Sequence, residues 1–222
     1  MVAAEGQEIL EVKGSLSPLE FQLRHPQLVG GETLEILRNV WQSIDASKFK
    51  INGIGTIEWH AEPDVARFIA YLTVVTKAKC VIEIGSFVGF TSCHIATALQ
   101  LLGEGNLYCI DIEDYLLTTA KNNLRKFNCE NLVLPILGNS LDPQVIEKLP
   151  QAEIIFIDSS HEYETTRREI EIYIKKLHQN GYLVLHDSIR FPGVRRAVSE
   201  CNLPKMTFAT SRGAGLTIIS QS

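Results

Sequence analysis

The sequence predicts an α/β fold, a doubly wound and mostly parallel seven-stranded Rossmann-like sheet, and two observations lead to this prediction. From residue 80 onward, short runs of Val, Ile and Leu alternate with segments whose apolar residues recur at helical spacing. The runs are almost continuously apolar, which is typical of parallel strands covered on both faces. They comprise residues 80–86, 106–112, 131–138, 153–160 and 182–188.

The second observation is that the end of the chain breaks this alternation. Residues 205–220 contain two strand-like runs around a glycine-rich turn. They predict an antiparallel hairpin at one edge of the parallel sheet. The expected helices of the alternating region are residues 91–102, 114–127, 142–149, 163–179 and 193–201. The fourth is expected to end at Asn180-Gly181, a typical helix stop.

Residues 1–76 are expected to form a helical and loop cover over a cofactor-binding core of residues 77–222, within a single domain. Helices are expected at residues 32–44 and 62–76, with a loop between them. Glu62 is expected to cap the second helix, and Pro63 suits its first turn.

Composition excludes several classes of function. The net charge is −5 and the chain has no basic tail, so a nucleic-acid partner is not expected. Neither a membrane span nor a signal peptide is expected, because long apolar runs and a basic start are missing. Five cysteines form no CxxC pair, which favours free thiols and a cytoplasmic location. Assembly into a homo-oligomer is left open.

A glycine-rich turn follows the first predicted strand. Gly85 and Gly89 would let the chain turn tightly and let a ligand approach the backbone near a helix N-terminus. The dinucleotide fingerprint is broken by Phe87, and no phosphate-binding Gly-Lys-Ser/Thr follows. Glu83 lies in the strand before the turn, and Asp111 at the tip of the next strand is placed to bind a ribose diol. The simpler interpretation is an ordinary strand-to-helix turn.

Acidic residues also end the fourth and fifth predicted strands. Asp158 ends one, and His186, Asp187 and Ser188 end the other, so these groups should meet in one crevice. Two close carboxylates repel each other unless a proton or cation lies between them, and Mg²⁺ suits such oxygen ligands. Alternatively, the acids cap helices or pair with arginines such as Arg190.

Together these segments resemble the small S-adenosylmethionine-dependent O-methyltransferases. The similarity is to the metal-dependent catechol and caffeoyl-CoA type and to the sugar O-methyltransferases of antibiotic pathways. It covers roughly residues 80–193, and it is carried by VIEIGSFVGFTS, IDIEDY, LGNS, IFIDSSHEY and GYLVLHDSIRFPG. The resemblance implies a seven-stranded fold of this class and S-adenosylmethionine as cofactor.

The resemblance also implies which residues bind the cofactor. Its methionine end would meet the glycine turn and Thr91, its ribose would meet Asp111, and its adenine would lie near Ile112 and the Asn139-Ser140 pair. The full set is Glu83, Gly85, Ser86, Phe87, Gly89, Thr91, Asp111, Ile112, Asn139, Ser140 and Asp158. For the segment Asn139-Ser140-Leu141-Asp142, capping of the next helix is the alternative.

In the related enzymes the metal ligands end strands four and five, which here implies Mg²⁺ bound by Asp158 and Asp187. The third ligand is open. Ser188 stands where the catechol type has an amide, and His186 stands where the sugar-modifying type has a glutamate.

His161 follows Asp158 by three residues, where the catechol type has a basic lysine and the sugar-modifying type a histidine. A neutral histidine can take a hydroxyl proton near pH 7, which implies a general base. The alternative is a capping box of Ser159 and Glu162, with His161 as a first-turn residue. His60 is a weaker candidate for covering the cofactor or substrate, His94 is expected to be packed or half-exposed, and His25 and His178 are expected at the surface.

The sequence therefore predicts a Mg²⁺-assisted O-methyltransferase that acts on a small molecule with neighbouring oxygens. The alternatives are a metal-independent methyltransferase and a non-catalytic, cofactor-binding partner protein. Nothing in the sequence identifies the acceptor.

Overall fold

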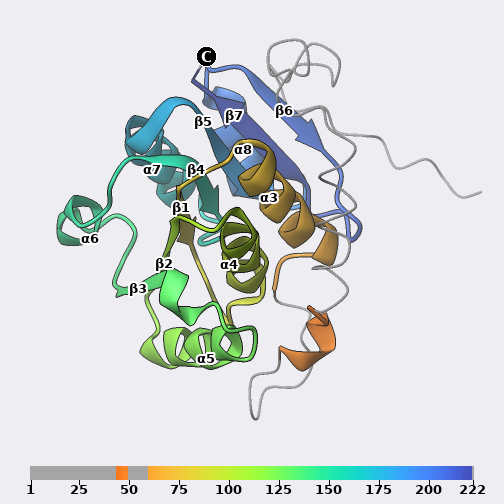
Figure 1. Ribbon diagram of the computed structural model, residues 1–222. Helices are drawn as coiled ribbons and strands as arrows, with labels where there is room; N and C mark the ends of the chain where they lie inside the picture. Colours follow the sequence, from red (N-terminus) through yellow and green to blue (C-terminus); the bar gives the residue numbers. More distant parts are fainter. Residues whose placement is uncertain (1–43, 50–59, 222) are drawn as a thin grey trace, which may run out of the picture.

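The structure is a computed structural model that describes residues 44–49 and 60–221 (Figure 1). Within the first of these ranges lies a short 3₁₀ helix, η2 (Ala46–Lys48). The helix expected over residues 32–44 and the surface position expected for His25 lie outside the described residues, except for Ile44.

Seven strands form one sheet in the order β3-β2-β1-β4-β5-β7-β6. The first five are parallel, whereas β7 pairs antiparallel with β5 and β6 pairs antiparallel with β7. This confirms a mostly parallel sheet with a C-terminal hairpin at one edge. The strands are β1 (Cys80–Ile84), β2 (Asn106–Asp111), β3 (Val133–Leu137), β4 (Ala152–Ile157), β5 (Leu177–His186), β6 (Lys205–Phe208) and β7 (Leu216–Ser220).

Helices cover both faces of the sheet because strand side chains alternate between the two faces. Val81 packs in a core with α3, α4 and α5, while Ile82 and Ile84 pack in a second core with α6, α7 and α8. In Figure 1, α3 and α4 lie in front of the sheet. The α-helices are α3 (Pro63–Val75), α4 (Phe90–Leu102), α5 (Asp114–Arg125), α6 (Pro143–Glu147), α7 (Tyr163–Tyr173) and α8 (Pro192–Glu200), and 3₁₀ helices are η3 (Glu130–Leu132) and η4 (Ile174–Lys176).

The helix expected to run to Asn180-Gly181 ends earlier. Helix α7 stops at Tyr173, η4 follows, and Leu177 already belongs to β5, where it pairs with Ala152. The register then shifts before Tyr182 pairs with Ile154, so the extra residues form an irregularity in the strand. Asn180 takes up the left-handed conformation there, with φ +66°.

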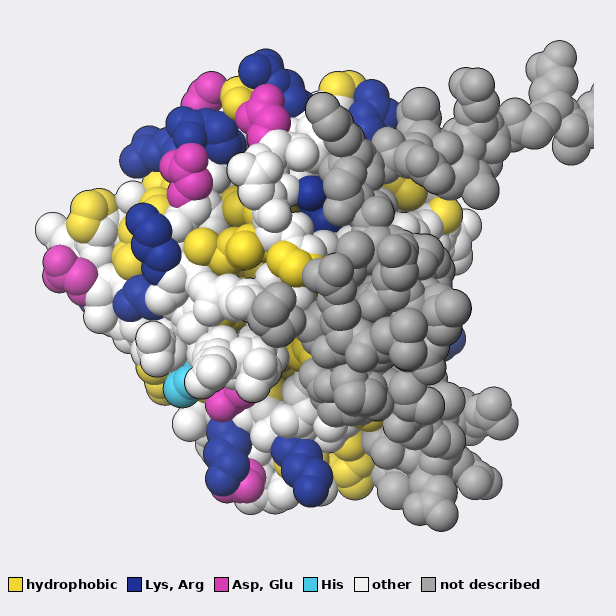
Figure 2. All heavy atoms as spheres, turned by 90° about the horizontal axis from the view of Figure 1, so that it is seen from above, with side chains coloured by type: hydrophobic (Ala, Val, Ile, Leu, Met, Phe, Trp, Pro, Cys, Tyr) yellow, Lys and Arg dark blue, Asp and Glu magenta, His cyan; other side chains and the backbone are white. Residues whose placement is uncertain are grey.

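The order of the strands reverses between β1 and β4, the kind of position where α/β sheets bind ligands beyond the carboxyl ends of their strands. On the face shown in Figure 2, the Lys and Arg side chains of the described residues are interspersed with Asp and Glu. No helix within the described ranges is long and apolar enough to cross a bilayer. The five cysteines are free thiols.

Candidate active site

A cavity of about 770 Å³ opens beyond the carboxyl ends of β1, β2, β4 and β5. Its size lies within the range of small-molecule sites, about 300–1,000 Å³. Residues 60–62, 190–191, 212 and 214 complete its wall. Nine of the expected cofactor residues line it, namely Gly85, Ser86, Phe87, Thr91, Asp111, Ile112, Asn139, Ser140 and Asp158.

The glycine turn brings β1 against the end of β4. Gly85 has a φ of +85°, and a Cβ there would lie 2.1 Å from the carbonyl oxygen of Asp158. Only glycine fits such an approach. Gly89 also has a positive φ, but a Cβ there would meet Ala120 at 2.8 Å, and Gly89 does not line the cavity. Gly89 therefore serves the packing of α4 on α5.

Asp111 holds the turn from the neighbouring strand. Its carboxylate accepts hydrogen bonds from the backbone N–H of Phe87 at 2.8 Å and of Glu113 at 3.1 Å. A carboxylate has further acceptor sites, so these bonds do not prevent a contact with a ligand hydroxyl. The adjacent Ser86 hydroxyl is buried at the cavity wall and has no hydrogen-bond partner within the described part of the chain.

Glu83 does not line the cavity, in contrast to the expectation for a cofactor residue. The alternation along β1 turns its side chain into the core against α4, where the Ser92 hydroxyl and the Cys109 thiol donate to it. Burial raises the pKa of Glu83 to about 8, although the two hydrogen bonds act in the opposite direction. Glu83 thus links β1, β2 and α4 beneath the turn.

The Asn139-Ser140 edge of the cavity contains a residue that sequence reasoning missed. Glu169, fully buried on α7, accepts hydrogen bonds from the hydroxyls of Ser140 at 2.6 Å and Ser159 at 2.8 Å. Burial raises the pKa of Glu169. The only sequence signal was an acid on the apolar side of a helical pattern. Capping of α6 falls to Asp142, whose side chain accepts from the N–H of Gln144.

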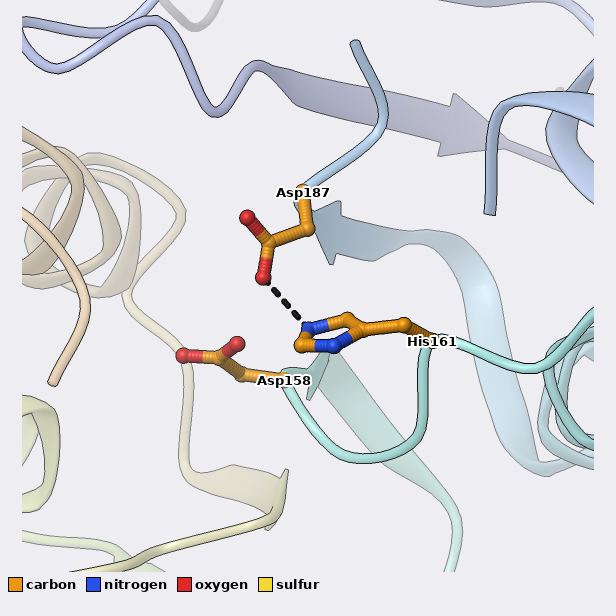
Figure 3. A group of neighbouring side chains, drawn as sticks. All are labelled: Asp158, His161 and Asp187. Atoms are coloured by element: carbon orange, nitrogen blue, oxygen red, sulfur yellow. Dashed lines mark hydrogen bonds and ion pairs between the residues drawn. The ribbon is translucent and has the colours of Figure 1, made fainter. Parts of the chain in front are cut away.

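Asp158, His161 and Asp187 converge beyond the strand ends, as Figure 3 shows. One ligand atom of each lies within 4.8 Å of the others. Nε2 of His161 lies 2.7 Å from Oδ2 of Asp187, and its ring stacks on Phe191 with centroids 3.7 Å apart. The alternative capping box is wrong, because Glu162 makes no side-chain cap and Ser159 bonds to Glu169.

His186 is a buried bridge between carboxylates. Its Nδ1 lies 2.9 Å from Asp158, and its Nε2 lies 2.5 Å from Glu62. Burial lowers the pKa of His186, but the charge of Asp158 and the hydrogen bonds to both acids outweigh burial and raise it well above its ordinary value. Burial tends to raise the pKa of Glu62, yet hydrogen bonds from His186 and Thr210 hold it well below its ordinary value. Glu62 is the N-cap residue of α3, as expected, but its carboxylate makes no capping hydrogen bond to that helix.

Of the two candidates for the third metal ligand, His186 lines the cavity and Ser188 does not, and neither belongs to the group of described residues that could hold a metal ion. Ser188 is fully buried, and its hydroxyl has no partner among the described residues and does not line the cavity. Both nitrogens of His186 already face carboxylates. The residue that joins the two acids is His161.

The remaining described histidines differ in position. His60 is buried and lines the cavity, and burial lowers its pKa. Its ring is tilted by 37° against the ring of Phe90, with centroids 4.3 Å apart. His94 is fully packed within α4, with Nδ1 2.9 Å from the carbonyl oxygen of Phe90. His178 is exposed, as expected.

Comparisons with known proteins agree with this architecture. A family model described as a methyltransferase domain matches residues 82–188. No curated protein sequence matches the chain.

Solved structures share the fold across nearly the whole chain. The O-methyltransferase of Bacillus cereus in complex with S-adenosylhomocysteine is 18% identical with a TM-score of 0.62, over 90% of this chain and 95% of that one. TomG of Streptomyces achromogenes, involved in tomaymycin synthesis and bound to S-adenosylmethionine, is 16% identical with a TM-score of 0.62, over 92% and 95%. The cofactor-bound Rv0187 from MTB is 16% identical with a TM-score of 0.64, over 91% and 95%.

The matching domain spans the glycine turn of β1, the acid that ends β2 and the polar ends of β4 and β5, which are the parts that build the cavity. Nearly half of the chain, residues 82–188, thus matches a methyltransferase domain, and the chain has the fold of solved O-methyltransferases.

Proposed function

We propose that this protein is a methyltransferase that transfers the methyl group of S-adenosylmethionine to a hydroxyl oxygen of a small molecule, with His161 as general base. The observation that carries the proposal is the placement of His161. Its ring lies at the wall of the cavity and is held by Asp187 on one edge and Phe191 on one face. The structural neighbours that are O-methyltransferases support the same type of transfer.

The cofactor would occupy the part of the cavity around the glycine turn. The hydroxyl of Ser86, which has no partner among the described residues, and the side chain of Thr91 would meet its methionine end, and Asp111 its ribose. Ile112, which is 65% exposed, would cover the adenine, whose edge would face Asn139 and Ser140. Asp158 would lie close to the sulfonium, because its backbone touches Gly85.

His161 is oriented for proton transfer by its neighbours. Because Nε2 faces Asp187, Nδ1 is the nitrogen that would accept the proton of the acceptor hydroxyl. Asp187 would fix the tautomer and stabilise the imidazolium that forms, as carboxylates do beside catalytic histidines. The stack on Phe191 limits rotation of the ring, which favours reaction by holding the groups in place.

We also propose that Asp158 and Asp187 hold Mg²⁺. Their carboxylates lie close enough for one cation to contact both, and Mg²⁺ commonly binds through one or two carboxylates with water completing its shell. When bound, the cation would lower the pKa of an acceptor hydroxyl. With water as the remaining ligands, Ser188 is not required and His161 stays available as the base.

A second candidate is the same transfer without a metal, and His186 is the observation that favours it. A cation was inferred because the neighbouring carboxylates of Asp158 and Asp187 repel each other. His186 lies between them, with Nδ1 2.9 Å from Asp158 and 3.5 Å from Asp187. Because both of its nitrogens face carboxylates and its pKa is raised, the ring of His186 is held in the protonated form, and its positive charge offsets part of their negative charge.

Mass spectrometry of methyl transfer tests both candidates. The purified protein is incubated with S-adenosylmethionine and a panel of small molecules that carry neighbouring hydroxyls. A product heavier by one methyl group, lost with chelator and restored by Mg²⁺, is the expected result. Full turnover in excess chelator would favour the metal-free candidate. Binding of S-adenosylhomocysteine without any product would contradict O-methyl transfer to this acceptor class.

A further inference from the structure

Two arginines line the cavity on the side of the proposed base. Arg190 directly precedes Phe191, the residue whose ring stacks on His161. Arg212 lies in the turn between β6 and β7 and lines the cavity together with His60. Both arginines are exposed, so they form the outer part of the wall.

A hydrogen bond to a backbone carbonyl holds each of these two side chains in place. Nη2 of Arg190 donates to the carbonyl oxygen of Arg212 at 3.0 Å, and Nη2 of Arg212 donates to the carbonyl oxygen of His60 at 2.6 Å. The turn itself is anchored, because Asp64 accepts from the N–H and hydroxyl of Ser211. The two guanidinium groups are therefore positioned before any ligand binds, which reduces the entropy lost on binding.

The charge deeper in the cavity has the opposite sign. Glu62, Asp158 and Asp187 contribute three carboxylates, and His186 lies among them. This excess of negative charge attracts the positive sulfonium of the cofactor and repels an anion. An anionic group on the acceptor would thus be rejected by the interior and attracted to the mouth.

From this polarity we infer that the methyl acceptor carries an oxyanion group, which Arg190 and Arg212 bind while its hydroxyl points inward to His161. The planar fork of a guanidinium matches both carboxylate and phosphate-like groups, often through two parallel hydrogen bonds. The opposed charges orient the acceptor, because the reverse orientation places its anion against Asp158 and Asp187.

The inference rests on the proposed function, so its test begins with protein saturated with S-adenosylhomocysteine. Calorimetry then compares a dihydroxybenzoate, the matching dihydroxyphenylphosphonate and the neutral dihydroxybenzamide. At least one of the two anions should bind roughly tenfold more tightly than the amide, the lower end of what a charge-assisted hydrogen bond contributes. The tighter anion identifies the group that is bound.

Variants separate the arginines from the rest of the site. Arg190→Gln and Arg212→Gln should abolish the preference for the anion, and Arg212→Lys should restore part of it. Arg196→Gln is the matched control, because Arg196 lies on α8 outside the cavity and pairs with Glu200. It should keep the full preference. All four variants should bind S-adenosylhomocysteine as the wild type does.

Each contrary result is distinct. If S-adenosylhomocysteine binds but the anions bind no better than the amide, or none of the three binds, the inference is wrong while the cofactor assignment stands. If the glutamine variants keep the preference for the anion, other residues bind it and the inference is wrong. If they instead lose S-adenosylhomocysteine, the arginines serve the cofactor. Failure of the wild type to bind S-adenosylhomocysteine contradicts the proposed function itself.

Discussion

Glu62 and His186 are 124 residues apart in the chain, yet Oε2 of Glu62 lies 2.5 Å from Nε2 of His186. The same carboxylate accepts a hydrogen bond from Thr210 at 2.7 Å. The residue before α3 thereby joins the end of β5 to the hairpin turn. Because His186 also contacts Asp158, this contact supports the position of one acid in the active site.

Glu62→Gln should destabilise the protein by about 3–5 kcal/mol, the usual cost of removing one partner of a buried ion pair. The substitution removes the negative charge of Glu62, the most buried of the carboxylates that pair with His186. Urea denaturation measures the change. Glu104→Gln is the control, since Glu104 forms an exposed pair with Lys79 and should cost about 1 kcal/mol or less. Equal losses of unfolding free energy in the two variants would mean that the buried pair stabilises the protein no more than the exposed one.

Gly85→Ala should remove cofactor binding and destabilise the fold. Gly103→Ala is a matched control, because Gly103 has a similar φ of +78° but nothing within 4 Å of an added Cβ. The control should cost about 1–2 kcal/mol for the left-handed conformation alone. Gly85→Ala must in addition displace the backbone of Asp158. Calorimetry and urea denaturation report the two effects, and a Gly85→Ala protein no worse than the control would contradict the close approach.

The parts of the fold that the sequence predicts correctly are those with a local signal. Strand β4 is a continuous apolar run, and the Gly-rich segment before Leu216 marks the hairpin. The end of α7 was mispredicted because Leu177 suits the apolar side of a continuing helix equally well. Its pairing with Ala152 is a tertiary contact that helical periodicity does not encode.

The site shows the same division. The convergence of Asp158 and Asp187 follows from strand ends in a parallel sheet, so their proximity was predictable. The contact between His186 and Glu62 was not predictable, because the sequence around Glu62 indicates only the start of a helix. The expectation that Ser188 faces the metal site failed for a similar reason. Asp187 adopts a φ of +60°, and the sequence does not reveal that the next side chain, Ser188, is consequently buried.

His94 should make the fold sensitive to acid. Burial, its largest influence, lowers the pKa of His94 to about 4 from an ordinary value of 6.5. As the pH falls below 6.5 the unfolded chain takes up a proton first, so stability is lost between pH 6.5 and 4 and levels off below that. A difference of one pH unit between the pKa values in the folded and unfolded states corresponds to about 1.4 kcal/mol of stability.

His94→Gln removes this titration, so its free energy of unfolding should fall less than that of the wild type between pH 7 and pH 4. His178→Gln, at an exposed position, should keep the wild-type profile. Parallel profiles for the wild type and His94→Gln would show that the ring is not held neutral by burial.

His161→Ala should lower turnover by a factor on the order of 10²–10⁴, the usual contribution of a positioned base. Affinity for S-adenosylmethionine should remain nearly unchanged, because the ring faces the acceptor. His178→Ala serves as the control. A His161→Ala enzyme with wild-type turnover would mean that the proton leaves through another group.

Isothermal titration with S-adenosylhomocysteine tests the central claim most directly, that this cavity binds the methyl donor. The wild type should bind it with micromolar affinity. Asp111→Ala should bind more weakly, because the variant lacks both the carboxylate that faces the cavity and the acceptor that holds the N–H of Phe87. A wild-type protein that binds NAD and shows no heat with S-adenosylhomocysteine would contradict the assignment of the cavity.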